Sequence, residues 1–151
     1  MGQRASDTRS INLEDVRVSS ANLIGGVEGK GWFNAMTAFD LSRPNIAAHA
    51  TGISRAAFEH ALQYADERET FGKKLHQHQA IQFMLADMKT KIEASRALTW
   101  KTAWESDNGV RNTESAAHAK RFAADTAMEV TTDAVRFLAG TDTPRNIQLL
   151  A

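Results

Sequence analysis

The stretch ERETFGKKLHQHQAIQFMLADM, Glu67–Met88, joins the end of one helical pattern to the start of another through a glycine-containing connection. In its C-terminal half, apolar residues recur at steps of three and four, which predicts an amphipathic helix that ends at the stop signal SDNG, 106–109. The apolar stripe of that helix consists of Ile81, Met84, Leu85, Met88 and Ile92. Two helices joined by a short connection are typical of antiparallel neighbours in an α-helical bundle.

A second apolar stripe lies upstream and predicts a helix that ends near Arg68. Its members are Ile46, Ala50, Ile53, Ala57, Ala61 and Tyr64. Pro44 lies near the beginning of this pattern and lacks a backbone donor, so either the helix kinks there or a fresh helix begins with Ser42 as its cap. Both alternatives place Asp40 and Arg43 on or beside a helix end.

A third helix is predicted to open after Asn112 or Thr113, either of which can cap it. Its stripe consists mostly of small residues: Ala116, Ala119, Ala123, Ala127, Val130, Ala134 and Phe137. Residues 141–151 are too few for another such helix, so the fourth helix of a bundle is missing or truncated, and its groove is left to a partner or to solvent. We therefore predict an all-α fold, an up-down bundle of three long helices.

Residues 1–28 follow a different pattern. INLEDVRVSS, 11–20, alternates apolar and polar residues, and four glycines follow between Gly25 and Gly31. This alternation predicts one or two strands and then a loop, a short β segment at the N-terminus that precedes the helical bundle.

Composition excludes several classes of function. Eighteen Lys plus Arg balance eighteen Asp plus Glu, so no net field attracts nucleic acid or an anionic membrane. The chain has no cysteine, which excludes disulfides and thiolate metal sites. No apolar run approaches the roughly 20 residues of a membrane helix. We expect a soluble globular domain without a nucleic-acid or membrane partner.

Histidine spacing does not support a metal site. Glu114 and His118 are four residues apart and occur once, whereas His76 and His78 lie on different faces of any helix that contains both. The sequence also lacks the Gly-x-Ser-x-Gly elbow of a serine nucleophile and the Walker loop of a nucleotide site. We assign no metal ligand.

The segment DERETFGKKLHQHQ, 66–79, contains residue types that suit a phosphate site. Arg68 can hold a phosphate by two parallel hydrogen bonds, and Thr70 adds a hydroxyl. Phe71 offers a flat face, and Gly72 allows the backbone to come close. A helix-end charge cluster followed by a turn explains the same residues, so physical chemistry alone leaves both interpretations open.

A longer string, YADERETFGKKLHQHQAIQFMLADM, resembles the flavin-binding segment of the acyl-CoA dehydrogenase family, with its Arg, Phe-Gly and Leu-Ala-Asp-Met. The resemblance extends upstream through GKGWFNAMTAFDLSRPNIAAHATGISRAAFEHALQYA and downstream through AWESDNGVRNTESAAHAKRFAADTAMEVTTDAV, and it is strongest to the medium-chain branch. It implies that residues 1–28 are the remnant of a middle β-domain with its linker, and that residues 29–151 are the C-terminal helical bundle domain.

The resemblance also implies ligands. Members of this family bind FAD between the subunits of a dimer or tetramer and dehydrogenate fatty acyl-CoA. Residues that match the flavin motifs are Arg68, Thr70, Phe71, His78 and Gln79, and, in RFLAG, Arg136 and Gly140. Arg136 stands where the family has a glutamine, and Ala139 where it has a glycine. Asp40, Ser42 and Arg43 match positions near the substrate and its coenzyme A part.

The resemblance gives no catalytic residue to this chain. The family removes an α-proton with a glutamate that follows the stretch matched here, or with a carboxylate at the position of Ser42, whose hydroxyl is no base near neutral pH. We expect an FAD- and acyl-CoA-binding domain that is inactive alone; the alternative is a non-catalytic helical oligomerisation or acyl-CoA-binding module. Trp100 and Trp104 match no motif and are assigned to packing or subunit contact. The implied location is the mitochondrial matrix in a eukaryote and otherwise the cytoplasm.

Overall fold

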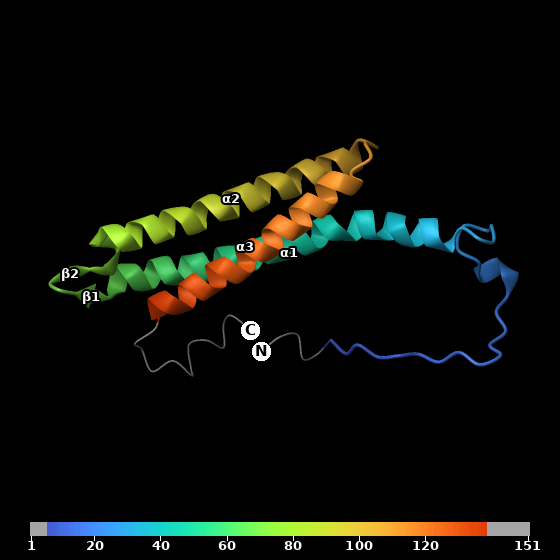
Figure 1. Ribbon diagram of the computed structural model, residues 1–151, viewed down its shortest axis with the longest axis horizontal. Coiled ribbons are helices and arrows are strands. Elements are labelled where there is room, and N and C mark those ends of the chain that lie inside the picture. Colours follow the sequence, from blue (N-terminus) through green and yellow to red (C-terminus); the bar gives the residue numbers. More distant parts are fainter. Residues whose placement is uncertain (1–5, 139–151) are drawn as a thin grey trace.

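The computed structural model describes residues 6–138, which form three long helices and one small hairpin (Figure 1). The helices are α1 (Gly31–Glu67), α2 (Gln79–Asp107) and α3 (Thr113–Leu138). Between α1 and α2 lie β1 (Glu69–Thr70), β2 (Lys73–Lys74) and the 3-10 turn η2 (Leu75–Gln77); another such turn, η1 (Ser20–Asn22), precedes α1. The chain runs up, down and up through the helices, which confirms the predicted all-α bundle.

The ends of the helices follow the predicted signals. Helix α1 ends at Glu67, and α2 ends at Asp107, two residues before Gly109, whose φ of 67° lies in the left-handed region. Helix α3 begins at Thr113, and the Asn112 carbonyl accepts a hydrogen bond from the Ala116 amide at 2.8 Å. Both predicted cap side chains donate elsewhere, because Asn112 bonds the Thr102 carbonyl and Thr113 bonds a carboxylate of α1.

Helix α1 is continuous through Pro44, which is buried. The predicted alternative of a fresh helix capped by Ser42 is therefore wrong, and the Ser42 hydroxyl instead donates to the Phe39 carbonyl at 3.2 Å. The axis of α1 changes direction in its N-terminal half (Figure 1), as expected where a proline interrupts the hydrogen bonding of a helix.

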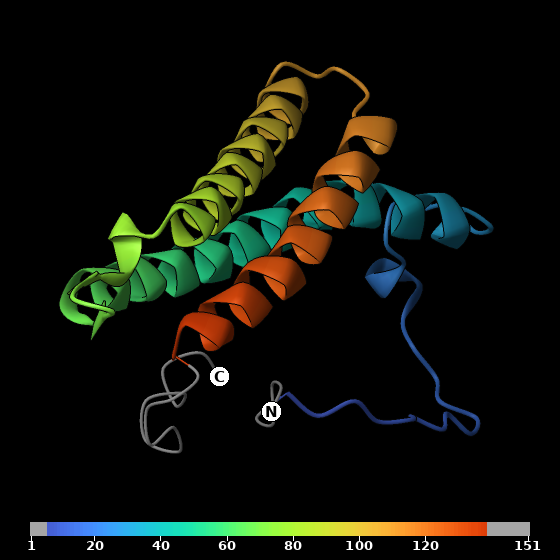
Figure 2. The ribbon, with the colours of Figure 1, turned by 60° about the vertical axis from the view of Figure 1, so that its left-hand side comes forward.

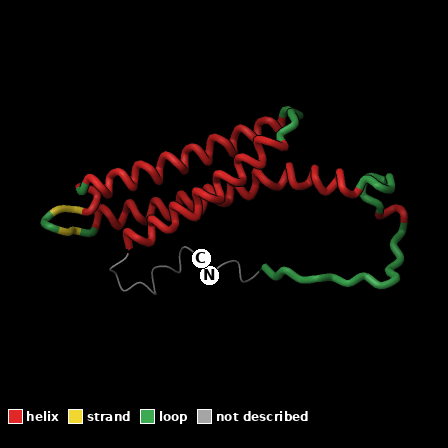
Figure 3. The backbone as a smooth tube through the Cα atoms, viewed as in Figure 1, coloured by secondary structure: helices red, strands yellow, loops and turns green. Residues whose placement is uncertain are grey.

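The N-terminal β prediction is wrong. Residues 6–28 contain no strand and form a loop apart from the turn at η1 (Figure 3). The apolar residues of the alternating pattern are exposed: Ile11, Leu13, Val16 and Val18. An isolated strand is unstable because its backbone groups need a neighbouring strand, and no described residue of this chain supplies one.

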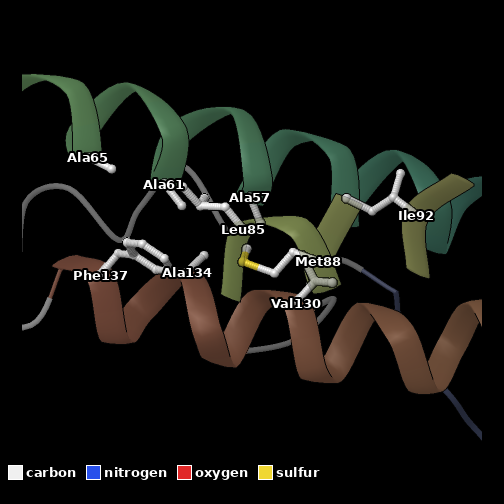
Figure 4. Packing of buried hydrophobic residues seen from close by; sticks show 9 residues of the cluster. All are labelled: Ala57, Ala61, Ala65, Leu85, Met88, Ile92, Val130, Ala134 and Phe137. Carbon is white, nitrogen blue, oxygen red and sulfur yellow. The ribbon is translucent and has the colours of Figure 1, made fainter. Parts of the chain in front are cut away.

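The bundle has two core clusters. The larger is centred on the hairpin end and contains large side chains from α2 and α3 against alanines of α1 (Figure 4): Ala57, Ala61, Ala65, Leu85, Met88, Ile92, Val130, Ala134 and Phe137. The smaller joins α1 to α3 through four alanines: Ala47, Ala50, Ala119 and Ala123. Small side chains on both helices allow α3 to cross α1 closely (Figure 2).

The predicted apolar stripes are confirmed for α2 and α3 and partly wrong for α1. On α3 all seven predicted residues are buried except the half-buried Ala127. On α1, however, Ile46 and Ile53 are 49% and 38% exposed, whereas their neighbours Ala47 and Ser54 are fully buried. The predicted Ala50, Ala57 and Ala61 are buried, but Ala47 and Ser54 take the places predicted for the two isoleucines, because small side chains rather than large ones fit against α3.

Two further findings concern the exposed tryptophans of α2 and the apolar character of the helices. Trp100 and Trp104 are exposed on α2, so the prediction that they pack within the chain is wrong for the described residues, and the alternative of a subunit contact stays a prediction. Within residues 6–138, no helix combines the length and the apolar character needed to cross a membrane.

Candidate functional site

The hairpin between α1 and α2 presents Phe71 to solvent. β1 and β2 pair antiparallel, with Glu69 opposite Lys74 and Thr70 opposite Lys73. The two turn residues, Phe71 and Gly72, have φ values of 53° and 76°, the left-handed pair that a tight hairpin needs. Glycine adopts this conformation readily, but an aromatic residue there is strained. The Phe71 side chain is nevertheless 98% exposed, so packing within the described chain does not explain it.

Contacts from the hairpin and from the turn η2 fix this segment to the end of α1. The Leu75 amide donates to the Arg68 carbonyl at 2.9 Å, and the Lys74 ammonium lies 3.1 Å from the Asp66 carboxylate. The His76 ring contacts the Ala65 carbonyl through Nδ1 at 3.3 Å. These contacts hold Arg68 at the junction of the helix and the hairpin.

His78 connects the hairpin to the start of α2. Its Nε2 lies 3.1 Å from the Thr70 hydroxyl and 3.3 Å from the Thr70 carbonyl. Its ring also meets the Phe71 ring edge to face, with centroids 6.4 Å apart. His78 therefore orients Thr70 and Phe71 of the hairpin. The next residue, Gln79, is exposed at the first turn of α2.

A pocket of about 220 Å³ lies beneath the hairpin, between the C-terminal ends of α1 and α3. Its lining combines two arginines with a hydroxyl and apolar walls: Tyr64, Arg68, Thr70, Leu75, Ile81, Arg136 and Phe137. Arg136 donates to Asp133 at 2.8 Å, whereas the Arg68 guanidinium has no hydrogen-bond or ion-pair partner among residues 6–138. We call this hollow the hairpin pocket.

The hairpin pocket has the donors that an anionic group requires. Two arginines line one hollow, and none of the residues that line it is acidic. The exposed Phe71 ring beside it can stack on a flat ligand. The predicted residues Arg68, Thr70, Phe71, His78 and Arg136 are thus brought to one end of the bundle, and Gly140 lies outside the described residues.

A second pocket, of about 360 Å³, lies at the opposite end of the bundle. Helix α1 and the connection between α2 and α3 line it: Phe33, Met36, Thr37, Asp40, Leu41, Arg111, Asn112 and Thr113. The Asp40 carboxylate accepts from the Thr113 hydroxyl at 2.6 Å and from Arg43 at 2.8 Å. We call this hollow the loop pocket.

The loop pocket contains a residue that sequence reasoning missed. Arg111 lies in a short connection with no recognisable local motif, and only the fold brings it beside Asp40. The antiparallel order of α2 and α3 was the one available signal, because it places their connection next to the N-terminal half of α1. The predicted Ser42 and Arg43 do not line this pocket, although Arg43 reaches it through Asp40.

Metal chemistry finds no support in the described part of the chain. Across residues 6–138, no three or more His, Asp or Glu side chains gather in a group that could hold a metal ion.

Comparison with known proteins identifies relatives over most of the chain. Residues 29–142 match the family model described as acyl-CoA dehydrogenase, C-terminal domain. Cyclohexane-1-carbonyl-CoA dehydrogenase from Geobacter metallireducens is 48% identical over 140 residues, which cover 93% of this chain and 37% of that protein. A probable medium-chain specific acyl-CoA dehydrogenase 2, mitochondrial, from Caenorhabditis briggsae is 47% identical over 77% of this chain and 28% of its own length.

The fold also matches a solved structure. Butyryl-CoA dehydrogenase from Megasphaera elsdenii superposes with a TM-score of 0.75 at 48% identity, over 76% of this chain and 30% of that one. The present chain thus spans about a third of the length of the relatives it matches.

Proposed function

The chain belongs to the acyl-CoA dehydrogenase family, and from this premise we propose that it is the FAD- and acyl-CoA-binding helical domain of a flavin-dependent acyl-CoA dehydrogenase. The protein that contains such a domain removes hydrogen from the α and β carbons of a fatty acyl-CoA. One observation carries the proposal: the unpartnered Arg68 guanidinium lies in a pocket beside an aromatic ring, Phe71, that a strained hairpin holds in solvent.

The division of the chain into parts belongs to the same proposal. Residues 29–151 form the C-terminal helical domain, and residues 1–28 are the remnant of a middle β-domain with its linker. Two observations support this division: the family match begins at residue 29, and the apolar alternation around Ile11 and Val18 has no partner strand among the described residues.

The residues of the hairpin pocket fit FAD. Arg68 and Arg136 suit the diphosphate, Thr70 adds a hydroxyl, and Phe71 offers a face to a ring of the cofactor. His78 acts indirectly, because its contacts with Thr70 hold the hairpin in position. FAD, when bound, accepts the hydride that leaves the β-carbon of the substrate. The task of these side chains is to bind and orient the cofactor.

The loop pocket suits the coenzyme A part of the substrate. Arg111 offers a cation to its phosphates, and Asp40 offers an acceptor whose orientation is fixed by Thr113 and Arg43. Ser42 donates its hydroxyl to a carbonyl of its own helix, so it has no role as a base. We place substrate binding, and no proton transfer, on these residues.

Association with further copies completes the proposal. A homo-oligomer, dimer or tetramer, places the hairpin pocket against the cofactor of a neighbouring subunit, and the exposed Trp100 and Trp104 offer α2 as a contact surface. A bacterial cytoplasm or the mitochondrial matrix suits this function, and the mitochondrial relative from Caenorhabditis briggsae supports the second location.

The proposal is tested by size-exclusion chromatography of the full chain with FAD, with mass and flavin absorbance recorded together. We expect flavin to co-elute with a defined oligomer and to be lost in Arg68→Gln. Arg121→Gln is the matched control, because Arg121 is an exposed arginine that lines no described pocket on α3. Equal flavin binding by both variants contradicts the proposed role of Arg68.

A second candidate is a non-catalytic module that binds acyl-CoA or joins subunits. The loop pocket favours it, since that pocket is built without the hairpin. This second function is identified if the chain elutes without flavin but still binds coenzyme A, and if that binding is lost when Arg111 is substituted.

A further inference from the structure

The connection between α2 and α3 begins with the dipeptide Asn108-Gly109, which is exposed at the end of the bundle opposite the hairpin (Figure 1). In the whole sequence, Asn108 is the only asparagine that a glycine follows. Any other following residue carries a side chain beside its amide nitrogen, whereas glycine leaves that nitrogen open to approach. The pair is therefore the place in this chain where an asparagine side chain is most readily attacked by the backbone that follows it.

The reaction that this pair permits is deamidation. The Gly109 nitrogen gives its proton to hydroxide and attacks Cγ of Asn108. A C–N bond forms, the bond from Cγ to Nδ2 breaks, and Nδ2 leaves as ammonia after taking a proton from water. Water then opens the cyclic imide, at Cγ to give an aspartate or at the backbone carbonyl carbon to give an isoaspartate. The net change consumes water and releases ammonia, and it needs no oxidant or reductant.

The fold holds both reacting groups away from this reaction. The Asn108 side-chain amide donates to the Trp104 carbonyl at 2.8 Å, and the Gly109 amide donates to the Ser106 carbonyl at 3.2 Å. At the observed ψ of 11°, the Gly109 nitrogen is nearly eclipsed with the backbone nitrogen of Asn108, whereas ring closure requires it to be eclipsed with Cβ. The Cα–C bond of Asn108 must therefore rotate before the ring can close.

This rotation requires the last turn of α2 to open. The Val110 amide donates to the Glu105 carbonyl at 2.8 Å across the dipeptide, so this hydrogen bond is lost together with those of the two reacting groups. Each bond contributes modestly, because water replaces the lost partner at an exposed helix end. Helix ends open locally at a lower free energy than global unfolding requires. Opening of this turn thus limits the rate of deamidation in the folded chain.

The product does not restore the closed turn. A carboxylate at position 108 has no N–H to donate, so the Trp104 carbonyl loses the side-chain donor that it now has. The new charge lies beside Asp107 at the C-terminal end of α2, where the helix dipole and the neighbouring carboxylate both oppose it. An isoaspartate also lengthens the main chain of the connection that carries Arg111 into the loop pocket.

We propose that Asn108 is a deamidation site gated by the last turn of α2, and that its conversion keeps this turn open and loosens the connection that carries Arg111. Deamidation here does not depend on flavin binding in the hairpin pocket, and either can occur without the other.

The test incubates the full chain in weakly alkaline buffer, folded in one sample and unfolded in urea in another, and follows deamidation by mass spectrometry of tryptic peptides. Cleavage after Lys101 and Arg111 isolates Asn108 in peptide 102–111. Peptide 18–30 of the same digest is the matched control, because its asparagine, Asn22, is also exposed but precedes a leucine.

We expect peptide 102–111 to convert in both samples while peptide 18–30 stays unconverted. Conversion should be at least about tenfold slower in the folded sample, since opening breaks several hydrogen bonds that each shift the equilibrium by about fivefold. A folded sample that stays unconverted, or one that converts as fast as the unfolded sample, overturns the gated site. Equal conversion of the two peptides overturns the special reactivity of Asn108.

Two substitutions separate the chemistry from the gate. Gly109→Ala should slow the reaction in urea, because a methyl group then stands beside the attacking nitrogen. Asp107→Gln removes a negative charge from the C-terminal end of α2, so it should stabilise the turn and slow the folded reaction about two- to fivefold relative to the rate in urea. An unchanged ratio of the folded and unfolded rates in Asp107→Gln contradicts gating by the turn.

The effect of the product on the turn is measured with Asn108→Asp. Loss of the side-chain hydrogen bond should raise hydrogen exchange at the Gly109 and Val110 amides by about fivefold. Asn22→Asp is the control for an added carboxylate and should leave exchange at these amides unchanged. Equal exchange in Asn108→Asp and in the unmodified chain overturns the loosening of the connection.

Discussion

The two ends of the bundle are built differently. At the hairpin end, large side chains such as Met88, Ile92 and Phe137 fill the space between three helices. At the loop end, α1 and α3 meet through alanines, and α1 extends past the other two helices with Phe33 and Phe39 exposed (Figure 1). The hairpin end is thus held by the burial of large apolar side chains, whereas at the loop end polar contacts such as that between Asp40 and Thr113 add to the packing of alanines.

This difference in packing places the hairpin pocket on a well-filled core and the loop pocket on a sparsely filled one. A cofactor site gains from residues that are already in place, and the hairpin pocket lies directly on the larger core. The loop pocket lies over a thin core, where alanines bury little apolar area and hydrogen bonds from Thr113 and Arg43 orient the Asp40 carboxylate. The structure therefore predicts that substitutions at the hairpin end change stability more than those at the loop end.

The largest expected effect comes from Met88→Ala. Met88 is 1% exposed at the centre of the larger cluster, so its truncation leaves a cavity and should lower the free energy of unfolding by about 2–5 kcal/mol. Urea denaturation followed by circular dichroism measures it. Met128→Ala is the matched control, because Met128 is 70% exposed and its truncation should change stability by no more than about 0.5 kcal/mol. Similar losses in both variants would show that the hairpin end is not the stable end.

Much of this contrast was predictable from local sequence pattern. The stripes of α2 and α3 identified Met88, Ile92 and Phe137 as core, because large apolar residues at helical spacing must find cover. The helix boundaries predicted at Gly109 and Thr113 were also correct, although the Asn112 and Thr113 side chains form other hydrogen bonds instead of capping α3.

The errors came from interactions between distant parts of the chain. Ile46 and Ile53 were predicted as core, yet the close approach of α3 favours the smaller Ala47 and Ser54 at the interface. The alternation in residues 11–18 predicted strands, but strand formation depends on a partner that sequence alone does not supply. Arg111 was missed in the loop pocket for the same reason, because its neighbours lie in another helix.

A smaller effect is expected at the loop end from Thr113→Val. The substitution keeps the size of the side chain and removes the hydroxyl that donates to Asp40, so the free energy of unfolding should fall by about 1–2 kcal/mol. Thr132→Val is the control, because the exposed Thr132 hydroxyl only bonds a carbonyl of its own helix. The comparison fails if Thr113→Val destabilises the chain as strongly as Met88→Ala, since the loop end would then not be the weaker end.

The smallest effect concerns Lys91 on α2, whose ammonium donates to Glu129 on α3 and so joins the two helices between the ends of the bundle. This hydrogen bond raises the pKa of Lys91 above its ordinary value, and burial opposes the rise only in part. A pKa raised in the folded state stabilises the fold at pH values below the ordinary value of about 10.4, and the contribution is lost as the pH rises through the raised pKa.

Because both side chains of this pair are about half exposed, the contribution should not exceed about 0.2–1 kcal/mol. The free energy of unfolding of Lys91→Gln should therefore lie slightly below that of the unmodified chain near neutral pH, and the two values should converge in strongly alkaline solution. Lys73→Gln is the control for loss of a positive charge, because Lys73 has no ion pair among residues 6–138. A difference that widens with pH would mean that the pair between Lys91 and Glu129 does not stabilise the fold.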